Sequence, residues 1–180
     1  FTADAATSGS LITATGALTF ATVSNITTTA VSGATVDLSG AITASTIGTV
    51  KHTGAGNFRM DHTDNAVVTL ERLDLTDATG TNAVDLAGNT NAVTVNLGIG
   101  ADTVILSGAA DDVNLSTTAS VDTLEYTESQ STTAIASVSN FAFGSGGDII
   151  NIDLTDMEAD NAHASSRNTD LVMGNGVVMV

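Results

Sequence analysis

The sequence predicts an all-β protein, a parallel β-solenoid or β-roll with about nine residues for each strand and turn. Three observations support this prediction. A period of nine residues runs without gaps through the middle of the chain, and apolar residues alternate with polar ones inside each period. The chain has no proline and only 3% aromatic residues, so its core must be built from small and β-branched side chains, which suit thin, stacked strands.

The period is clearest in five consecutive blocks that start at residue 81. The third position of each block is alanine, and the eighth is leucine in all blocks but the first, which has Gly88. The sixth position is apolar in four blocks and is interrupted by Asp122 in the fifth. The blocks are 81–89, 90–98, 99–107, 108–116 and 117–125.

Each block is interpreted as a short strand followed by a turn. Val93, Val95 and Leu97 show the spacing of residues on one face of a strand, and Gly, Asn, Ser and Asp stand between such runs, as in turns. Two blocks are expected to form one coil, with equivalent positions 18 residues apart. An antiparallel β-sandwich is the alternative, because alternation alone does not distinguish the two folds.

Four regions follow along the chain. Residues 1–60, rich in Thr and Ala, are expected to form an irregular β-solenoid with longer coils, because regular apolar steps recur without a nine-residue phase. Residues 61–80 form a seam, in which 67–75 is either a strand or one helical turn. Residues 81–154 are the β-roll and the segment that follows it, and residues 155–180 are a polar loop and terminal strands. No apolar stretch is long enough to span a membrane.

Two glycine–aspartate motifs lie in the roll region, Gly98-Ile-Gly100-Ala-Asp102 and Gly144-Ser-Gly146-Gly-Asp148. They resemble the nonapeptide repeat of the RTX (haemolysin-type) proteins, in which glycine carbonyls and aspartates coordinate calcium. Both lack the first glycine, and no carboxylate stands 18 residues before or after Asp102. The resemblance implies possible calcium ligands at Gly98, Gly100, Asp102, Asp111, Gly144, Gly146 and Asp148.

Residues 122–154 carry a second, looser resemblance. Ile135-Ala-Ser-Val138-Ser-Asn-Phe141, followed by Gly147-Asp-Ile-Ile-Asn-Ile-Asp-Leu154, is similar to the segment after the repeats in type I-secreted bacterial proteins. S-layer proteins of Gram-negative bacteria have such segments and long Thr/Ala/Val/Ser/Gly stretches like residues 7–50. The resemblance implies an extracellular location at the bacterial cell surface.

Charge and composition exclude several function classes. The net charge is −16, so nucleic acid, whose phosphates need a basic patch, is not an expected partner. The absence of cysteine excludes disulfides and thiolate metal sites. The chain lacks G-x-S-x-G, H-E-x-x-H and P-loop motifs. A group made of His52, Asp61, His62 and Asp64 matches no catalytic template, so no enzyme is expected.

The expected function is therefore structural: a self-assembling surface-layer or fibre module, with calcium as a possible stabiliser. Its expected partners are further copies of itself and a cell-surface glycan. The alternative is the repeat and export domain of a type I-secreted enzyme or adhesin.

Overall fold

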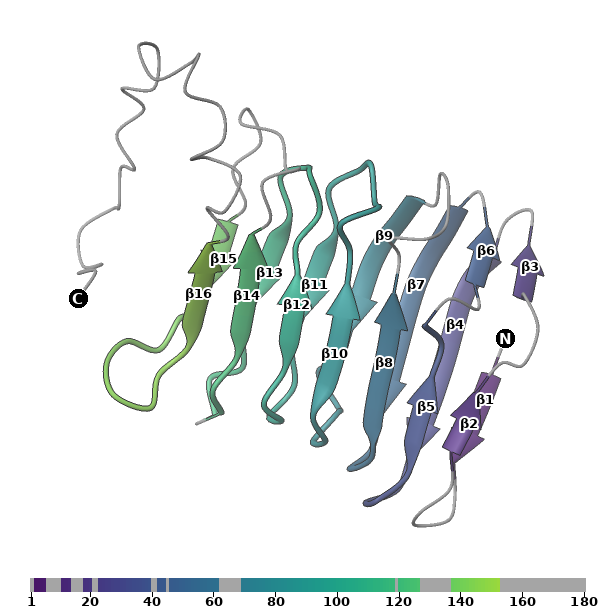
Figure 1. The fold of residues 1–180 in the computed structure, drawn as a ribbon, viewed down its shortest axis with the longest axis horizontal. Coiled ribbons are helices and arrows are strands. Elements are labelled where there is room, and N and C mark those ends of the chain that lie inside the picture. Colours follow the sequence, from purple (N-terminus) through teal and green to yellow (C-terminus); the bar gives the residue numbers. More distant parts are fainter. Residues whose placement is uncertain are drawn as a thin grey trace, which may run out of the picture.

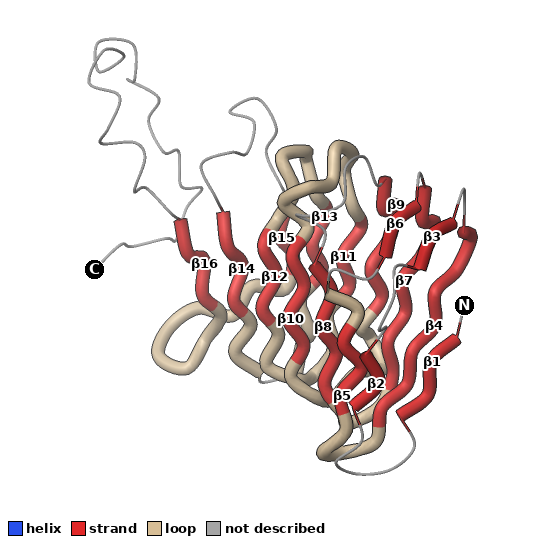
Figure 2. The backbone as a smooth tube through the Cα atoms, turned by 45° about the vertical axis from the view of Figure 1, so that its right-hand side comes forward, coloured by secondary structure: helices blue, strands red, loops and turns tan. Residues whose placement is uncertain are grey.

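The protein is a parallel β-solenoid, as the sequence predicts (Figures 1 and 2). A computed structural model describes residues 2–5, 11–13, 18–20, 23–39, 42–44, 46–61, 69–118, 120–126 and 137–152. Every strand pair within these ranges is parallel, which excludes the antiparallel sandwich. The described ranges contain no helix, and so none that could cross a membrane.

Two seven-stranded sheets face each other, and the chain passes from one to the other in each coil. The first, sheet A, lies behind in Figure 1. Its strands, in spatial order, are β1 (Thr2–Ala5), β4 (Val23–Ala30), β7 (Thr46–Thr53), β9 (Thr69–Asp74), β11 (Thr94–Asn96), β13 (Asp112–Asn114) and β15 (Ser137–Ser139).

The second, sheet B, lies in front. Its strands are stacked along the same axis as those of sheet A. A third, two-stranded sheet pairs β3 (Leu18–Phe20) with β6 (Ile42–Ala44). The strands of sheet B are β2 (Leu11–Thr13), β5 (Thr35–Asp37), β8 (Asn57–Asp61), β10 (Asn82–Asp85), β12 (Thr103–Ile105), β14 (Thr123–Tyr126) and β16 (Ile149–Ile152).

The expected coil of 18 residues is correct at only one step of the roll region. The backbone N–H of Val93 donates a hydrogen bond to the carboxylate of Asp111, which lies 18 residues further on, in the next coil. In sheet B, however, Asn82 and Asp102 are neighbours at 20 residues, and so are Asp102 and Asp122. The step from Asp122 to Asp148 is 26 residues. The coils differ in length because the turns accept extra residues while the strands keep their register.

The N-terminal coils are longer, as the absence of a nine-residue phase predicts. Thr28 and His52 are neighbours in β4 and β7, 24 residues apart. Within the seam, Thr69–Asp74 is a strand and not a helical turn. Residues 62–68 of the seam lie outside the described part of the chain, and so do the loop and terminal strands expected within 155–180.

A recurrent tripeptide ends many of the strands. Asp37, Asp74 and Asp85 each accept a hydrogen bond from the backbone N–H two residues further on, at 3.0, 3.2 and 2.8 Å. These Asx turns stop the strand and start the corner. The residue after each of these aspartates is a buried leucine, and β11 and β13 likewise end in an asparagine that is followed by a buried leucine. The buried leucines are Leu38, Leu75, Leu86, Leu97 and Leu115.

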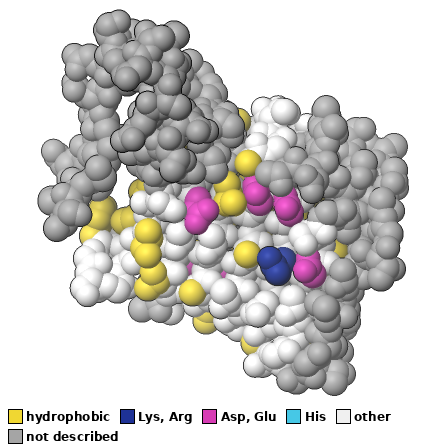
Figure 3. Space-filling view, in the orientation of Figure 1, with side chains coloured by type: hydrophobic (Ala, Val, Ile, Leu, Met, Phe, Trp, Pro, Cys, Tyr) yellow, Lys and Arg dark blue, Asp and Glu magenta, His cyan; other side chains and the backbone are white. Residues whose placement is uncertain are grey.

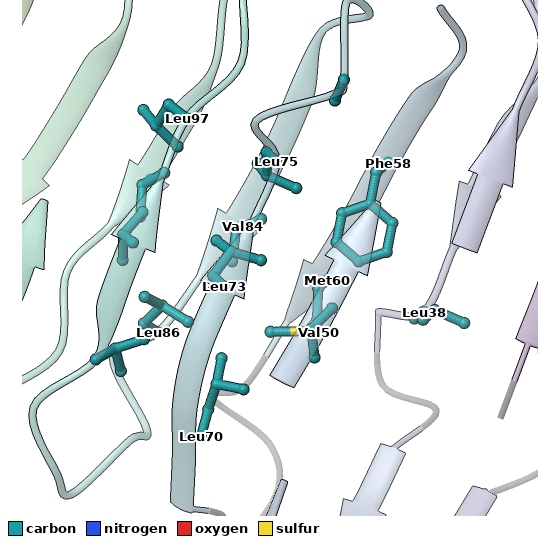
Figure 4. Packing of buried hydrophobic residues seen from close by; sticks show 14 of the residues in the cluster. Leu38, Val50, Phe58, Met60, Leu70, Leu73, Leu75, Val84, Leu86 and Leu97 are labelled. Carbon is teal, nitrogen blue, oxygen red and sulfur yellow. The ribbon is translucent and has the colours of Figure 1, made fainter. Parts of the chain in front are cut away.

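The core consists of side-chain columns that run along the stacking axis between the sheets (Figure 4). In sheet A one column is Ile26, Val50, Leu73, Val95, Val113 and Val138. In sheet B the matching column is Met60, Val84, Val104, Leu124 and Ile150. All but the last residue of each column are buried. The apolar sixth positions and the leucines at the eighth positions of the nine-residue blocks are thus core residues, as predicted.

Candidate functional site

A second inner column of sheet B changes from apolar to acidic along the solenoid. It begins with Val36 and Phe58, which pair in β5 and β8, and Phe58 pairs with Asn82 of β10. The next coils place Asp102, Asp122 and Asp148 at the same position, directly before β12, β14 and β16. We call Asn82, Asp102, Asp122 and Asp148 the Asn/Asp ladder.

Each rung of the ladder joins one coil to the next through backbone N–H groups. The side-chain Oδ1 of Asn82 accepts from the N–H of Phe58 at 3.1 Å, and Oδ1 of Asp102 accepts from the N–H of Asn82 at 3.1 Å. Asp122 and Asp148 accept in the same way from the N–H of the residue one coil earlier, both at 3.0 Å. These side-chain acceptors provide partners for buried backbone N–H groups at the start of each strand.

The carboxylates of Asp102 and Asp122 are only half used. Both residues are 1% exposed, and the Oδ2 atom of each is buried without a hydrogen-bond partner. Burial raises the pKa of Asp102 to about 7, and the charge of Asp122 adds to this, while hydrogen bonds from Asn82 and the nearby backbone N–H of Gly98 oppose it. Burial likewise raises the pKa of Asp122 to about 6, helped by the charge of Asp148. The ladder therefore holds two carboxyl groups that take up protons near neutral pH.

Asn82 occupies the same position without burying an unpartnered carboxylate oxygen. Its Nδ2 group donates to the backbone oxygen of Gly80 at 3.2 Å and to Oδ1 of Asp102 at 2.7 Å. An amide thus has partners for both of its polar atoms at the position where Asp102 and Asp122 each leave one oxygen unpartnered. The comparison shows that the inward-facing acid is not needed to hold the coils together.

Asp111 belongs to a different corner, between β12 and β13, and both of its oxygens are engaged. Oδ1 accepts from Ser107 Oγ at 2.7 Å and from the N–H of Val93 at 2.9 Å, and Oδ2 accepts from the N–H of Ser107 at 2.8 Å. Asn89 has a related role one coil earlier, where its Oδ1 accepts from the N–H of Leu70 at 2.7 Å. Asp111 is therefore a fully satisfied corner residue.

The two Gly-x-Gly motifs use glycine for different physical reasons. A Cβ at Gly100 would overlap the carbonyl oxygen of Gly80, and one at Gly80 would overlap that of Gly56, so a column of glycines lets the corners stack closely. Gly144 and Gly146 have open space around them but φ values of +97° and +78°, which glycine adopts readily. Similar sequence motifs thus serve close stacking in one corner and a left-handed turn in the other.

The structure brings together only part of the predicted calcium set. Asp102 and Asp148 share the Asn/Asp ladder, with Asp122 between them, whereas Asp111 lies in the other corner. Asp148 has both oxygens bonded, since its Oδ2 accepts from the N–H of Ala142 at 2.8 Å. Within the described ranges no three His, Cys, Asp or Glu residues form a group that could hold a metal ion.

Sequence reasoning missed Asn82 and Asp122 as members of the site. Asp122 interrupts the nine-residue pattern, but it stands 20 residues after Asp102, which in turn stands 20 after Asn82. Each is followed two residues later by an apolar residue that belongs to the core: Val84, Val104 and Leu124. A search for an Asn/Asp–x–apolar motif at a spacing of 20 would have found the ladder.

His52 is also buried, in sheet A. Its ring stacks on Phe58 with centroids 5.0 Å apart, Nδ1 lies 2.8 Å from Thr28 Oγ1, and Nε2 lies 3.4 Å from the Gly56 oxygen. Burial lowers the pKa of His52. Burial thus favours the neutral ring, which joins β4 to β7. His62 and Asp64, two other members of the group that matches no catalytic template, lie outside the described ranges.

The outer faces of the sheets carry small polar side chains. On sheet A, Asn114 donates to Asn96 at 3.0 Å. On sheet B, Asp61 and Asp85 are paired in register, and the front face in Figure 3 shows acidic groups in magenta on both sides of a basic group in dark blue. Burial raises the pKa of Asp85, and the charges of Asp61 and Glu125 add to this. The outer face of sheet B thus carries acidic groups among polar and apolar side chains.

Comparison with known proteins adds no relative: no family model, curated protein or solved structure matches the chain.

Proposed function

We propose that the chain is a structural, self-assembling module of an extracellular surface layer or fibre. One observation supports this most directly: the buried acids and the buried histidine of the described residues are held in contacts between segments of the solenoid. Asp102, Asp111 and Asp122 accept N–H groups of other segments, and His52 bridges two strands. Such contacts stiffen a stack of coils, whereas catalysis needs groups that reach a substrate.

The proposed location, a bacterial cell surface reached by type I secretion, is supported by composition and by the resemblance of residues 122–154. A net charge of −16 keeps an exported rod soluble, and the absence of cysteine removes any need for oxidative folding.

Electron microscopy and sedimentation velocity of the purified chain test the assembly. The proposal predicts particles that grow with protein concentration into sheets or fibres. A monomer at every concentration, with or without calcium, would contradict it.

Calcium remains part of the proposal, but the geometry restricts where it could act. Calcium takes six to eight oxygen ligands. Every carboxylate oxygen of Asp111 and Asp148 already accepts a hydrogen bond, which leaves these residues less free to bind a cation. Among the residues that the structure describes, the buried side-chain oxygens without a partner are Oδ2 of Asp102 and Oδ2 of Asp122, and they would hold a cation between two coils. Two oxygens are few for calcium, so weak binding is expected.

Calorimetric titration with calcium tests this point, using Asp102→Asn/Asp122→Asn as the comparison. Heat of binding in the wild-type chain that is lost in the double variant would support a cation at the ladder. Equal heats in both proteins would place any calcium elsewhere, and the ladder would then be structural only.

A further inference from the structure

We infer that the C-terminal end of the described solenoid, formed by β15 and β16, binds the N-terminal end of a second copy, where β1 and β2 lie. The inference rests on the proposed assembly and names the surface through which it proceeds. It describes a head-to-tail contact, which adds copies along the stacking axis without closing a ring.

Among the described residues, the last layer of the core is partly exposed at this end. Val84, Val104 and Leu124 are at most 2% exposed, but Ile150, the next residue of the same column, is 40% exposed. In the opposite sheet, Val113 is buried and its neighbour Val138 is only partly buried. The last layer of the core therefore has an apolar surface, and a further layer would bury it.

In the described part of the chain, the last strand of each sheet at this end has one unpaired edge. β15 and β16 are the last strands of sheets A and B, and the described ranges contain no strand beyond them (Figure 1). The four residues of β16, Ile149–Ile152, include no charged residue and no proline, the usual protection of an edge. Ile149 adds an outward apolar side chain that is 48% exposed. Such an edge is a template for another strand.

Strand direction and charge favour the N-terminal end of a second copy as the occupant. All pairs in both sheets are parallel, so a copy shifted along the axis places its β1 beside β15 and its β2 beside β16 and continues both sheets at once. Residues 1–60 have two acids and two bases, which sum to zero, whereas residues 61–180 hold the whole net charge of −16. Two C-terminal ends would repel each other, while the neutral N-terminal end would not.

The test is sedimentation velocity over a concentration series with the full chain and the variant Ile150→Lys. The matched control is Ile99→Lys, which changes an isoleucine that is 47% exposed in a corner away from the end. We expect Ile150→Lys to weaken association at least about tenfold, because the charge enters the centre of the contact, and Ile99→Lys to leave it within about twofold. If Ile150→Lys does not fold, Ile149→Lys tests the same edge from its outer side.

The outcomes separate the two proposals. Assembly of wild type that Ile150→Lys leaves unchanged, or that Ile99→Lys weakens equally, overturns this contact while self-assembly stands. A wild-type chain that stays monomeric overturns both. Since the chain has no cysteine, Asn151→Cys adds a second readout. Head-to-tail stacking predicts no disulfide dimer, and rapid oxidation to a dimer would mean that two C-terminal ends meet instead.

Discussion

The carboxylate Oδ1 of Asp122 accepts a hydrogen bond from the backbone N–H of Asp102, one coil earlier, at 3.0 Å. The same relation links Asn82 to Asp102 and Asp122 to Asp148, so Asp102 and Asp148, which the RTX resemblance suggests as calcium ligands, accept backbone N–H groups inside the solenoid. The second oxygen of Asp102 and that of Asp122 are left buried and unpartnered, and several measurable properties follow.

The first prediction is that Asp102→Asn stabilises the protein at pH 8. The new amide keeps Oδ1 as an acceptor for Asn82 and can donate to the Gly100 oxygen and to Asp122, as Asn82 does to Gly80 and Asp102. Removing a buried, half-partnered charge should raise the free energy of unfolding by about 1–3 kcal/mol. Urea denaturation followed by circular dichroism measures the change.

The control is the reverse change, Asn82→Asp. It removes the two Nδ2 donors and places a new carboxylate beside Asp102, so we expect a loss of about 1–3 kcal/mol at pH 8. If both variants destabilise the protein equally, the ladder tolerates only its native residues and the reasoning from Asn82 is wrong.

The second prediction concerns pH. The folded-state pKa values of Asp102 and Asp122, about 7 and about 6, lie above the ordinary value of 3.8, so the native state binds more protons than the unfolded state between these limits. The stabilisation that protonation of Asp102 and Asp122 gives the folded state is fully present below pH 3.8 and is lost as pH rises through 6 and 7. The free energy of unfolding then falls by up to about 1.4 kcal/mol per pH unit for each group.

Other groups also titrate, so the measurement is the difference in unfolding free energy between wild type and Asp102→Asn/Asp122→Asn from pH 4 to pH 8. We expect the double variant to gain stability relative to wild type as pH rises. A difference that is constant across this range would show that the two carboxyls titrate normally.

The third prediction separates the two kinds of glycine. Gly100→Ala places a Cβ against the backbone oxygen of Gly80, which cannot move without parting two coils, so we expect a loss of about 3 kcal/mol or more, or failure to fold. Gly144→Ala meets no atom but has φ +97°, so we expect a loss of about 1–2 kcal/mol. Thermal unfolding of the two variants gives the order, and equal losses would contradict the stacking role.

The fourth prediction concerns His52. Burial lowers its pKa from the ordinary 6.5, so its contribution to stability is present above pH 6.5 and is lost as pH falls towards the folded pKa. This trend is opposite to that of the ladder. NMR titration of the imidazole should give a midpoint below 6.5 in the folded protein, with the chain in urea as the reference. A midpoint at or above 6.5 would mean that the ring is not buried against Phe58.

Much of the fold could be predicted from the sequence. The alternation in residues such as Val93, Val95 and Leu97 marks side chains that are buried, and the parallel solenoid follows from the period. The coil length could not be predicted, because the nine-residue phase fits the step from Val93 to Asp111 while sheet B steps by 20 residues. Because the corners contain different numbers of residues while the strands stay aligned, a fixed period in the sequence does not show which residues are neighbours in adjacent coils.

The site was less predictable for the same reason. With a coil of 18, Asp102 has no acidic neighbour, whereas the real spacing places Asp122 beside it. The direction in which a turn aspartate faces depends on which N–H groups lack a partner in the next coil, and that information is absent from a local motif. The Gly-x-Gly patterns around Gly100 and Gly144 show the same limit, since one serves stacking and the other a left-handed turn.

The most direct test of the ladder is the carboxyl carbon shift of Asp102, followed by NMR as a function of pH in the folded protein without calcium. The inward-facing arrangement predicts a midpoint of about 7, raised by burial and by the neighbouring Asp122. A midpoint near 3.8 would mean that the carboxylate is solvated in the turn, and the inward-facing ladder would then be wrong.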